Sequence, residues 1–288
     1  MTDHPSGRGP RAHWVILLLS AVIGFALLCL NGYVSHVGEE SSGSPPRAPA
    51  DGAVPTAVAS GGPVLRFAAD GTVTSRALPA KTIALTFDDG PDPVYTPQIL
   101  AILARYHAHA TFFEIGSRVE SYPGIARQVL AGGNEIGSHT FTHVDPATTA
   151  GWRLDLEMGW AATAIEGVTG TRPVLVRPPY SSTPSAVTPA DLAATRRMAA
   201  GGYLVVLANL DTDDWRRPGV APIVAAATPS AGRGAVVMMH DSGGDRSQTV
   251  AALAQLIPRL QAQGYRFVTI SEALGLGPAP AASTAERI

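Results

Sequence analysis

Strand-like and helix-like segments alternate along the chain from Lys81 onward, and this alternation constrains the fold more than any other feature. Seven short apolar runs are typical of strands: Thr82–Phe87, Ala110–Gly116, Asn134–Ser138, Pro173–Val176, Tyr203–Leu210, Gly234–His240 and Tyr265–Ile270. Segments of helical character lie between most of them: 97–106, 124–131, 151–168, 190–200, 220–227 and 247–263. This pattern predicts a parallel sheet with helices on its faces, and about seven units favour a barrel-like closure.

Polar side chains follow five of these apolar runs. They are Asp88 and Asp89; His139 and His143; Arg177 and Tyr180; Asp211, Asp213, Asp214 and Trp215; and His240 and Asp241. Because the carboxyl ends of parallel strands meet on one face of a sheet or barrel, we expect these five clusters to converge on one cleft.

Each cluster also has a purely structural interpretation. An aspartate after a strand is often the cap of the next helix. His139 and His143 would lie one turn apart if their segment were helical, without any shared task. Trp215 and His240 could belong to the core, and Arg177 could pair with any buried carboxylate. Five unrelated structural roles at the same edge of the sheet are a less probable explanation than one shared functional site. We therefore favour the functional site.

These residue types suggest a specific chemistry. Two imidazoles and one carboxylate form an open catalytic metal site, in which water takes the fourth position. Such a metal lowers the pKa of the water and polarises a carbonyl oxygen. A second carboxylate, kept ionised by a nearby arginine, can accept the proton of that water. A histidine on the opposite side can protonate the leaving group. The predicted reaction is metal-assisted hydrolysis of an acyl bond.

Five motifs stand in order between Lys81 and Leu274: "TFDDGP", "SHTFTH", "RPPY", "DTDDW" and "VVMMHD". They resemble the motifs of the polysaccharide deacetylases, the carbohydrate esterases with the nodulation-type deacetylase domain. The resemblance implies an α/β fold, a distorted (β/α) barrel with fewer than eight strands, in agreement with the seven predicted above. One departure is that Ser181 follows Tyr180, where the family usually has glycine.

The resemblance also implies one divalent metal ion with three ligands: Asp89, His139 and His143. Zinc suits such a site, and cobalt or nickel could occupy it as well.

An acid–base pair follows from the same resemblance. Asp88 would be the catalytic base, oriented by Arg177, and His240 would be the general acid. Asp214 would tune His240, and its place in "DTDDW" favours it over Asp213.

The substrate-binding residues implied in this way are Pro179, Tyr180 and Trp215. The backbone amide of Tyr180 would help to stabilise the oxyanion, and Trp215 would wall the pocket for the acetyl methyl group. Asp241 and Arg246 could reach the cleft or hold their own loop, and they receive no role.

The implied reaction is hydrolysis of an N-acetyl group on an N-acetylhexosamine polymer of the cell envelope or outside the cell, which leaves an amine and releases acetate. One alternative is an O-acetyl esterase that acts on xylan or another acetylated glycan. Another is a non-catalytic glycan-binding protein. Nucleic acid is not an expected partner, because the net charge of −2 gives no basic footprint.

An uncharged apolar run, Trp14–Leu30, follows Arg8 and Arg11 near the N-terminus. It is about long enough to span a bilayer when residues 31–34 lie at the interface. The arginines predict that the N-terminus lies inside and the rest outside. A cleaved signal peptide, giving a secreted protein, is the alternative, but the run is long and no small-x-small site follows closely. We therefore predict a single-pass anchor in the cell membrane.

Composition divides the remaining chain. The predicted parts are a cytoplasmic N-terminus (1–13), a transmembrane anchor (14–34), a flexible linker (35–62), a short β extension (63–80), a polysaccharide deacetylase domain (81–276) and a disordered tail (277–288). The linker is rich in Ser, Pro, Gly and Ala, with little apolar surface to bury. In the β extension, Asp70-Gly71 is a turn signal between two β-prone runs, which predicts a hairpin. The one cysteine, Cys29, excludes an intramolecular disulfide.

Overall fold

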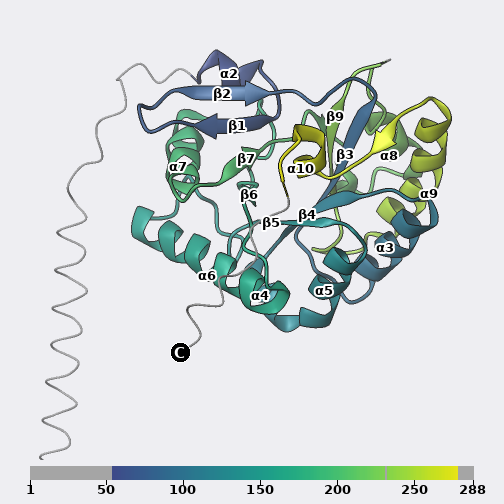
Figure 1. Ribbon diagram of the computed structural model, residues 1–288, viewed down its shortest axis with the longest axis horizontal. Coiled ribbons are helices and arrows are strands. Elements are labelled where there is room, and N and C mark those ends of the chain that lie inside the picture. Colours follow the sequence, from purple (N-terminus) through teal and green to yellow (C-terminus); the bar gives the residue numbers. More distant parts are fainter. Residues whose placement is uncertain (1–53, 231, 278–288) are drawn as a thin grey trace, which may run out of the picture. The chain divides into compact units, whose positions relative to one another are not determined.

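The computed structural model of the chain describes residues 54–230 and 232–277 (Figure 1). The predicted cytoplasmic segment, the anchor at 14–34, the linker up to residue 53 and the tail from residue 278 lie outside the described residues. Within the described ranges, no helix is both long and apolar enough to cross a membrane. The prediction of an anchor therefore stays a prediction.

One mixed sheet organises the described residues, with strand order β2-β1-β7-β6-β5-β4-β3-β9-β8 and β10 paired to β3. The strands are β1 (Val64–Phe67), β2 (Val73–Arg76), β3 (Thr82–Asp88), β4 (Ala110–Glu114), β5 (Glu135–Ser138), β6 (Leu175–Val176), β7 (Leu204–Val206), β8 (Leu210–Asp211), β9 (Ala235–His240) and β10 (Arg266–Phe267). All pairs between β7 and β8 along this order are parallel, as predicted. The first strand, β1, pairs antiparallel with both β2 and β7.

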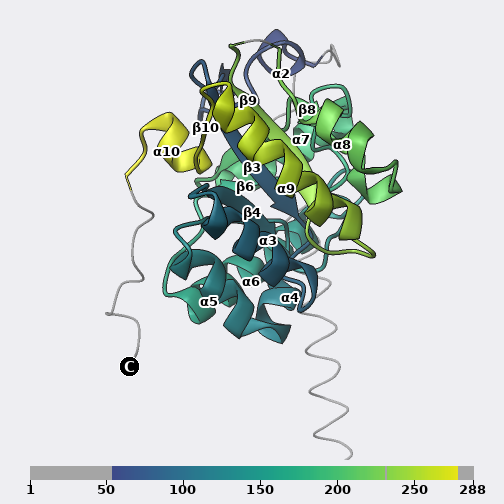
Figure 2. The same ribbon diagram turned by 90° about the vertical axis from the view of Figure 1, so that its right-hand side faces the viewer.

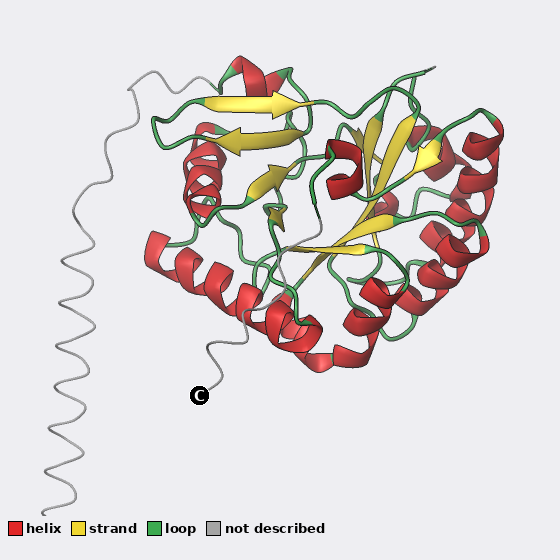
Figure 3. Cartoon of the chain, in the orientation of Figure 1, coloured by secondary structure: helices red, strands yellow, loops and turns green. Residues whose placement is uncertain are grey.

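Helices surround this sheet (Figures 1 and 3). They are α2 (Thr56–Ala59), α3 (Tyr95–Arg105), α4 (Gly116–Ser121), α5 (Pro123–Ala131), α6 (Gly151–Thr169), α7 (Pro189–Ala200), the 3₁₀ helix η1 (Asp214–Arg216), α8 (Val220–Ala226), α9 (Ser247–Ala262) and α10 (Ile270–Leu274). The six predicted helices are confirmed as α3 and α5 to α9. Two short helices, α4 and α10, begin at the last residue of segments predicted as strands.

The sheet is curled into a half-barrel. Only three residues, 207–209, connect β7 in one half of the sheet to β8 at the far edge of the other half. The predicted strand Tyr203–Leu210 is split: β7 pairs with β6 and β1, whereas β8 pairs with β9 on the other side. The Cα atoms of Val206 and Leu210 can be at most about 15 Å apart. Between them, Asn209 hydrogen-bonds Val236 of β9 through its backbone N–H and its side-chain oxygen. The predicted parallel strands are confirmed, and they form a half-barrel within a mixed sheet to which β1 and β2 add antiparallel pairs.

The segment before β3 belongs to this sheet. The predicted hairpin is present as β1 and β2, and the pairing of β1 with β7 makes it an extension of the sheet (Figure 1). The prediction of a flexible linker up to residue 62 is wrong for the described residues 54–62. They include α2, whose Val58 is buried in the same apolar cluster as Leu65, and this burial fixes the segment.

Strand periodicity decides which residues face the inside of the curl. On β3, the odd-numbered apolar residues pack beneath α3 and α9, which cover the sheet in Figure 2, and Ala84 packs in the inner cluster. On β9, Val237 lies outside and Val236 inside. Since successive side chains of a strand point to opposite faces, Asp88 and His240 end their strands on the inner face. They are also register partners.

Candidate active site

Buried side-chain atoms without a hydrogen-bond partner mark one end of the sheet. Within residues 54–230 and 232–277, eight such nitrogen and oxygen atoms occur. All belong to residues at, or one or two positions after, the carboxyl end of a strand: Asp89, Glu114, Ser138, Thr140, Arg177, Asp241 and Ser242. Native structures leave few buried polar groups unpaired. Their concentration at this end indicates a place built for an ion or a ligand.

Asp88 is held there by a buried arginine. Nη1 of Arg177 donates to Oδ1 of Asp88 at 2.7 Å and to Oγ1 of Thr86 at 2.7 Å. The guanidinium lies 4.3 Å from the centre of the Phe113 ring, and the side chain is fully buried. The second oxygen of Asp88, Oδ2, lies 4.0 Å from Nε2 of His139. One oxygen is thus fixed by Arg177, and the other faces the histidines.

Asp89, His139 and His143 form a three-residue cluster whose candidate ligand atoms lie within 4.8 Å of one another. Oδ1 of Asp89 lies 3.2 Å from Nε2 of His143 and 3.6 Å from Nε2 of His139, without forming a well-oriented hydrogen bond. Nδ1 of His139 donates to the carbonyl oxygen of Arg177 at 2.8 Å, which leaves the Nε2 lone pair free for a metal.

The electrostatics of this cluster favour the protonation states that a metal requires. Burial opposes ionisation of Asp89, but the close contact with His143 and the neighbouring imidazoles of His139 and His240 hold its pKa well below the usual range. Burial also lowers the pKa of His139. An ionised carboxylate and a neutral imidazole are the forms that bind a metal.

A loop brings His139 and His143 together. Their spacing would also have allowed a helix, but the segment between them is not helical. Thr140 and His143 have φ of 64° and 60°, in the left-handed region that excludes an α-helix. Glu157 of α6 is buried and holds this loop: its carboxylate accepts from the N–H groups of Phe141 at 3.1 Å and Thr142 at 2.7 Å. It also accepts from Oγ1 of Thr142 at 2.7 Å.

His240 carries its own carboxylate partner. Its Nδ1 lies 2.8 Å from Oδ1 of Asp214, whose Oδ2 accepts from the backbone N–H of His240 at 2.9 Å and from Oγ1 of Thr249 at 2.6 Å. Burial alone would lower the pKa of His240, but Asp214 raises it to about 9. Asp213 lies outside this arrangement, since it is exposed and pairs with Arg216 at 3.0 Å.

Comparison with known proteins agrees with this geometry. The family model described as polysaccharide deacetylase matches residues 75–198. A peptidoglycan-N-acetylglucosamine deacetylase of Bacillus cereus is 45% identical over 196 residues, which cover 67% of this chain and 88% of that protein. The chain belongs to the polysaccharide deacetylase family.

Solved structures of the family share the fold. A peptidoglycan N-acetylglucosamine deacetylase, solved in complex with a naphthyl N-hydroxybenzamide, has a TM-score of 0.63 and 28% identity, and the match covers 69% of this chain and 91% of that one. A Bacillus anthracis protein described as a pseudoenzyme of the same family has a TM-score of 0.58 and 27% identity, with 67% and 65% covered. The family therefore includes both proteins named as deacetylases and one described as a pseudoenzyme.

The predicted substrate-binding residues of this deacetylase domain come from two segments, the loop after β6 and η1. Tyr180 has a φ of 62°, is 68% exposed, and places its ring centre 4.9 Å from that of His143. Its backbone N–H has no protein acceptor among the described residues. Pro179 precedes it, and its carbonyl accepts from the N–H of Ser181 at 2.7 Å. Trp215 is half exposed in η1 next to Asp214. Its role as a pocket wall stays a prediction.

Asp241 and Arg246, left without a role above, hold the loop after β9. Oδ2 of Asp241 accepts from Oγ1 of Thr96 at 2.5 Å, and Nε of Arg246 donates to the carbonyl of Ser242 at 2.5 Å. Burial raises the pKa of Asp241 to about 7. These contacts support the loop-holding alternative.

Three residues near the site were not identified from the sequence: Glu114, Glu157 and Thr249. Glu114 is the one charged residue in the apolar run Ala110–Gly116. A single charged residue in a predicted buried strand could have identified it from the sequence. Glu157 shares the buried face of α6 with Leu154 and Ala161, at helical spacing. Thr249 carries no such signal, because its contact with Asp214 depends on the packing of α9.

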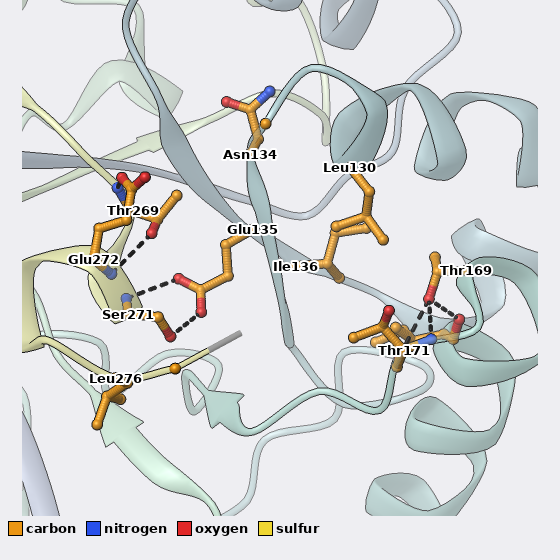
Figure 4. A pocket seen from close by; sticks show the side chains of 13 residues that line it. Leu130, Asn134, Glu135, Ile136, Thr169, Thr171, Thr269, Ser271, Glu272 and Leu276 are labelled. Carbon is orange, nitrogen blue, oxygen red and sulfur yellow. Dashed lines mark hydrogen bonds between the residues drawn. The ribbon is translucent and has the colours of Figure 1, made fainter. Parts of the chain in front are cut away.

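A cavity of about 430 Å³ lies at the opposite end of β5, between the end of α6 and α10 (Figure 4). Its half-buried carboxylate, Glu135, accepts from Oγ1 of Thr111 at 3.0 Å, from the N–H of Ser271 at 3.2 Å, and from the Ser271 hydroxyl. These groups satisfy one another, and the cavity shares no residue with the metal cluster.

Proposed function

We propose that this chain is a metal-dependent hydrolase that removes N-acetyl groups from N-acetylhexosamine units of a cell-envelope or extracellular polysaccharide. The observation that carries the proposal is the pairing of Asp88 with His240 across β3 and β9, beside an Asp-His-His cluster. Arg177 holds Asp88, and Asp214 holds His240. A base and an acid with separate partners beside metal ligands are the parts that amide hydrolysis requires.

The cluster fits one divalent metal ion, and zinc is our first choice. Two imidazole nitrogens and one carboxylate oxygen match an open zinc site, and Oδ1 of Asp89 is buried without a hydrogen-bond partner. Zinc held by Asp89, His139 and His143 would polarise the acyl carbonyl and lower the pKa of water beside it. Cobalt or nickel accept the same donor set.

The side chains on either side divide the proton transfers. Asp88 takes a proton from the attacking water through Oδ2, since Oδ1 is held by Arg177. His240 gives a proton to the departing nitrogen, and its pKa of about 9 keeps it protonated at neutral pH. We assign oxyanion stabilisation to the backbone N–H of Tyr180, which has no protein acceptor among the described residues. The products are acetate and the amine of the sugar.

Peptidoglycan is the substrate that we favour. It is named as the substrate of the Bacillus cereus relative, and the run at 14–34 predicts a domain held outside the cell membrane. An anchored enzyme of this orientation would meet the envelope glycan directly.

Incubation of the zinc-loaded full-length protein with peptidoglycan, chitin oligomers and acetylated xylan tests the proposal. We expect equal amounts of acetate and new amine from an N-acetylated glycan. Acetate without new amine would instead identify an O-acetyl esterase. Binding to a glycan without release of acetate from any glycan would identify a non-catalytic glycan-binding protein. The family already includes a Bacillus anthracis protein described as a pseudoenzyme.

A further inference from the structure

Three large apolar side chains lie in a row on the exposed side of α6: Trp152, Leu156 and Trp160, which are 56%, 41% and 50% exposed. Of the six large apolar or aromatic side chains exposed in the described part of the chain, half belong to this one helix. Their spacing of four residues places them on one face. Exposed apolar residues are usually scattered, and a contiguous patch indicates an interaction site. We call these three residues the α6 stripe.

The exposed face of α6 that holds the three side chains of the α6 stripe is open and has no charged residue between them. Gly159 and Thr163 lie on the same exposed face, and a Cβ added at Gly159 would meet nothing within 4 Å. The nearest charged residues of the helix, Arg153 and Asp155, flank the stripe. Asp155 is already paired, with Arg197 at 2.6 Å. The partner should therefore be a neutral group with flat apolar faces.

The α6 stripe continues into the candidate active site. The rings of Trp160 and Phe141 meet edge to face, 5.8 Å apart at 65°. Phe141 lies in the loop between His139 and His143, and the carboxylate of Glu157 ties that loop to the same helix. Figure 1 shows α6 at the outer edge of the helix layer. From Trp152 to Trp160 the helix rises about 12 Å, a distance longer than one sugar ring.

We propose that the α6 stripe binds the polysaccharide chain next to the sugar that is deacetylated. The proposal rests on the function proposed above and adds an extended binding surface outside the five motifs. Pyranose rings carry apolar C–H faces, which stack on the electron-rich faces of indole rings, and acetamido sugars are uncharged like the stripe. A lipid surface is disfavoured, because interfacial helices carry many basic residues along the polar face.

The test compares long and short substrates with a double variant, Trp152→Ala with Trp160→Ala, in the full-length protein. We expect kcat/KM to fall roughly tenfold on an N-acetylglucosamine polymer, as two lost aromatic contacts predict, and to stay unchanged on a short oligomer. Thr163→Ala is the matched control, since it changes the same exposed face without removing an aromatic ring, and it should behave as wild type. An equal fall on both substrates, or no fall on the polymer, would overturn the proposal.

Co-sedimentation with insoluble polymer gives a second readout that does not depend on catalysis. Wild type should be retained and the double variant released. If wild type liberates no acetate from any glycan, the proposed function fails, but retention still decides the role of the α6 stripe. Unchanged retention of the double variant would contradict that role. Two other results for the double variant would also contradict that role, provided that polymer binding is kept. One is loss of binding to phosphatidylcholine vesicles, and the other is a change of oligomeric state.

Discussion

The two ends of the curled sheet bury polar side chains with opposite outcomes. At the carboxyl ends of the strands lie all eight unpartnered buried atoms of the described residues. At the other end, the half-buried Glu135 receives hydrogen bonds from Ser271 and Thr111. Withdrawal from solvent therefore does not by itself distinguish a functional carboxylate from a structural one. The distinction is whether the fold satisfies the group or leaves it for a ligand.

Backbone conformations with positive φ at residues other than glycine are also concentrated at the carboxyl ends of the strands. Of the eight non-glycine residues with positive φ in the described ranges, five follow the carboxyl end of a strand: Asp89, Thr140, His143, Tyr180 and Asp213. Such conformations cost on the order of 1–3 kcal/mol each and persist where the surroundings impose them. The loops of the candidate site are thus held in place at a cost in stability, and contacts such as those of Glu157 offset it.

The strongest test of this contrast is Asp88→Asn. The amide can still accept the hydrogen bond of Arg177, so the chain should fold, but it cannot take a proton from water. We expect acetate release to fall about a thousandfold, with thermal unfolding close to that of wild type. Activity that survives this change would contradict the assignment of Asp88 as the base.

Glu157→Ala tests how the candidate metal ligands at the carboxyl ends of the strands are held in place. It removes three hydrogen bonds that hold the loop between the two histidines. We expect zinc affinity to fall about tenfold or more, measured by competition with a chelator. Rescue of acetate release at high zinc would distinguish weakened metal binding from general unfolding, and Thr163→Ala on the same helix is the control.

Asp214→Asn tests the acid side through pH. In the folded chain Asp214 raises the pKa of His240 to about 9, so His240 carries its proton below that pH and loses it above. The variant should lower this pKa and move the alkaline limb of the kcat/KM profile down by about one unit or more. The stabilisation from this pair is full below a pH of about 6.5 and is lost towards 9. An unmoved alkaline limb would show that His240 is not the acid.

Glu135→Ala, at the opposite end, should have the smallest effect on activity. The change leaves Ser271 and Thr111 without an acceptor, so we expect a loss of about 1–3 kcal/mol in the free energy of unfolding. Activity per folded molecule and zinc affinity should match wild type. A large loss of activity in the folded variant would show that the two ends are not as separate as the geometry indicates.

Local pattern was sufficient to predict much of this domain. Continuous apolar runs, each followed directly by polar residues, were the pattern that identified Asp88, Asp89 and His240. In contrast, the division of Tyr203–Leu210 into β7 and β8 depends on closure of the sheet, and no local pattern encodes it. The role of Glu157 also depends on tertiary contact, because two of its three partners are backbone N–H groups, which nearly every residue type provides.

The pairing of β3 with β9 has a consequence for synthesis of the chain. Asp88 is made early, but His240, its partner in the register, follows about 150 residues later, and β10 later still. One edge of β3 therefore remains open while most of the domain is translated, and an open edge invites pairing with other chains. The base and the acid are brought together only when translation is nearly complete, so a truncated chain that retains all three metal ligands would still lack a working pair.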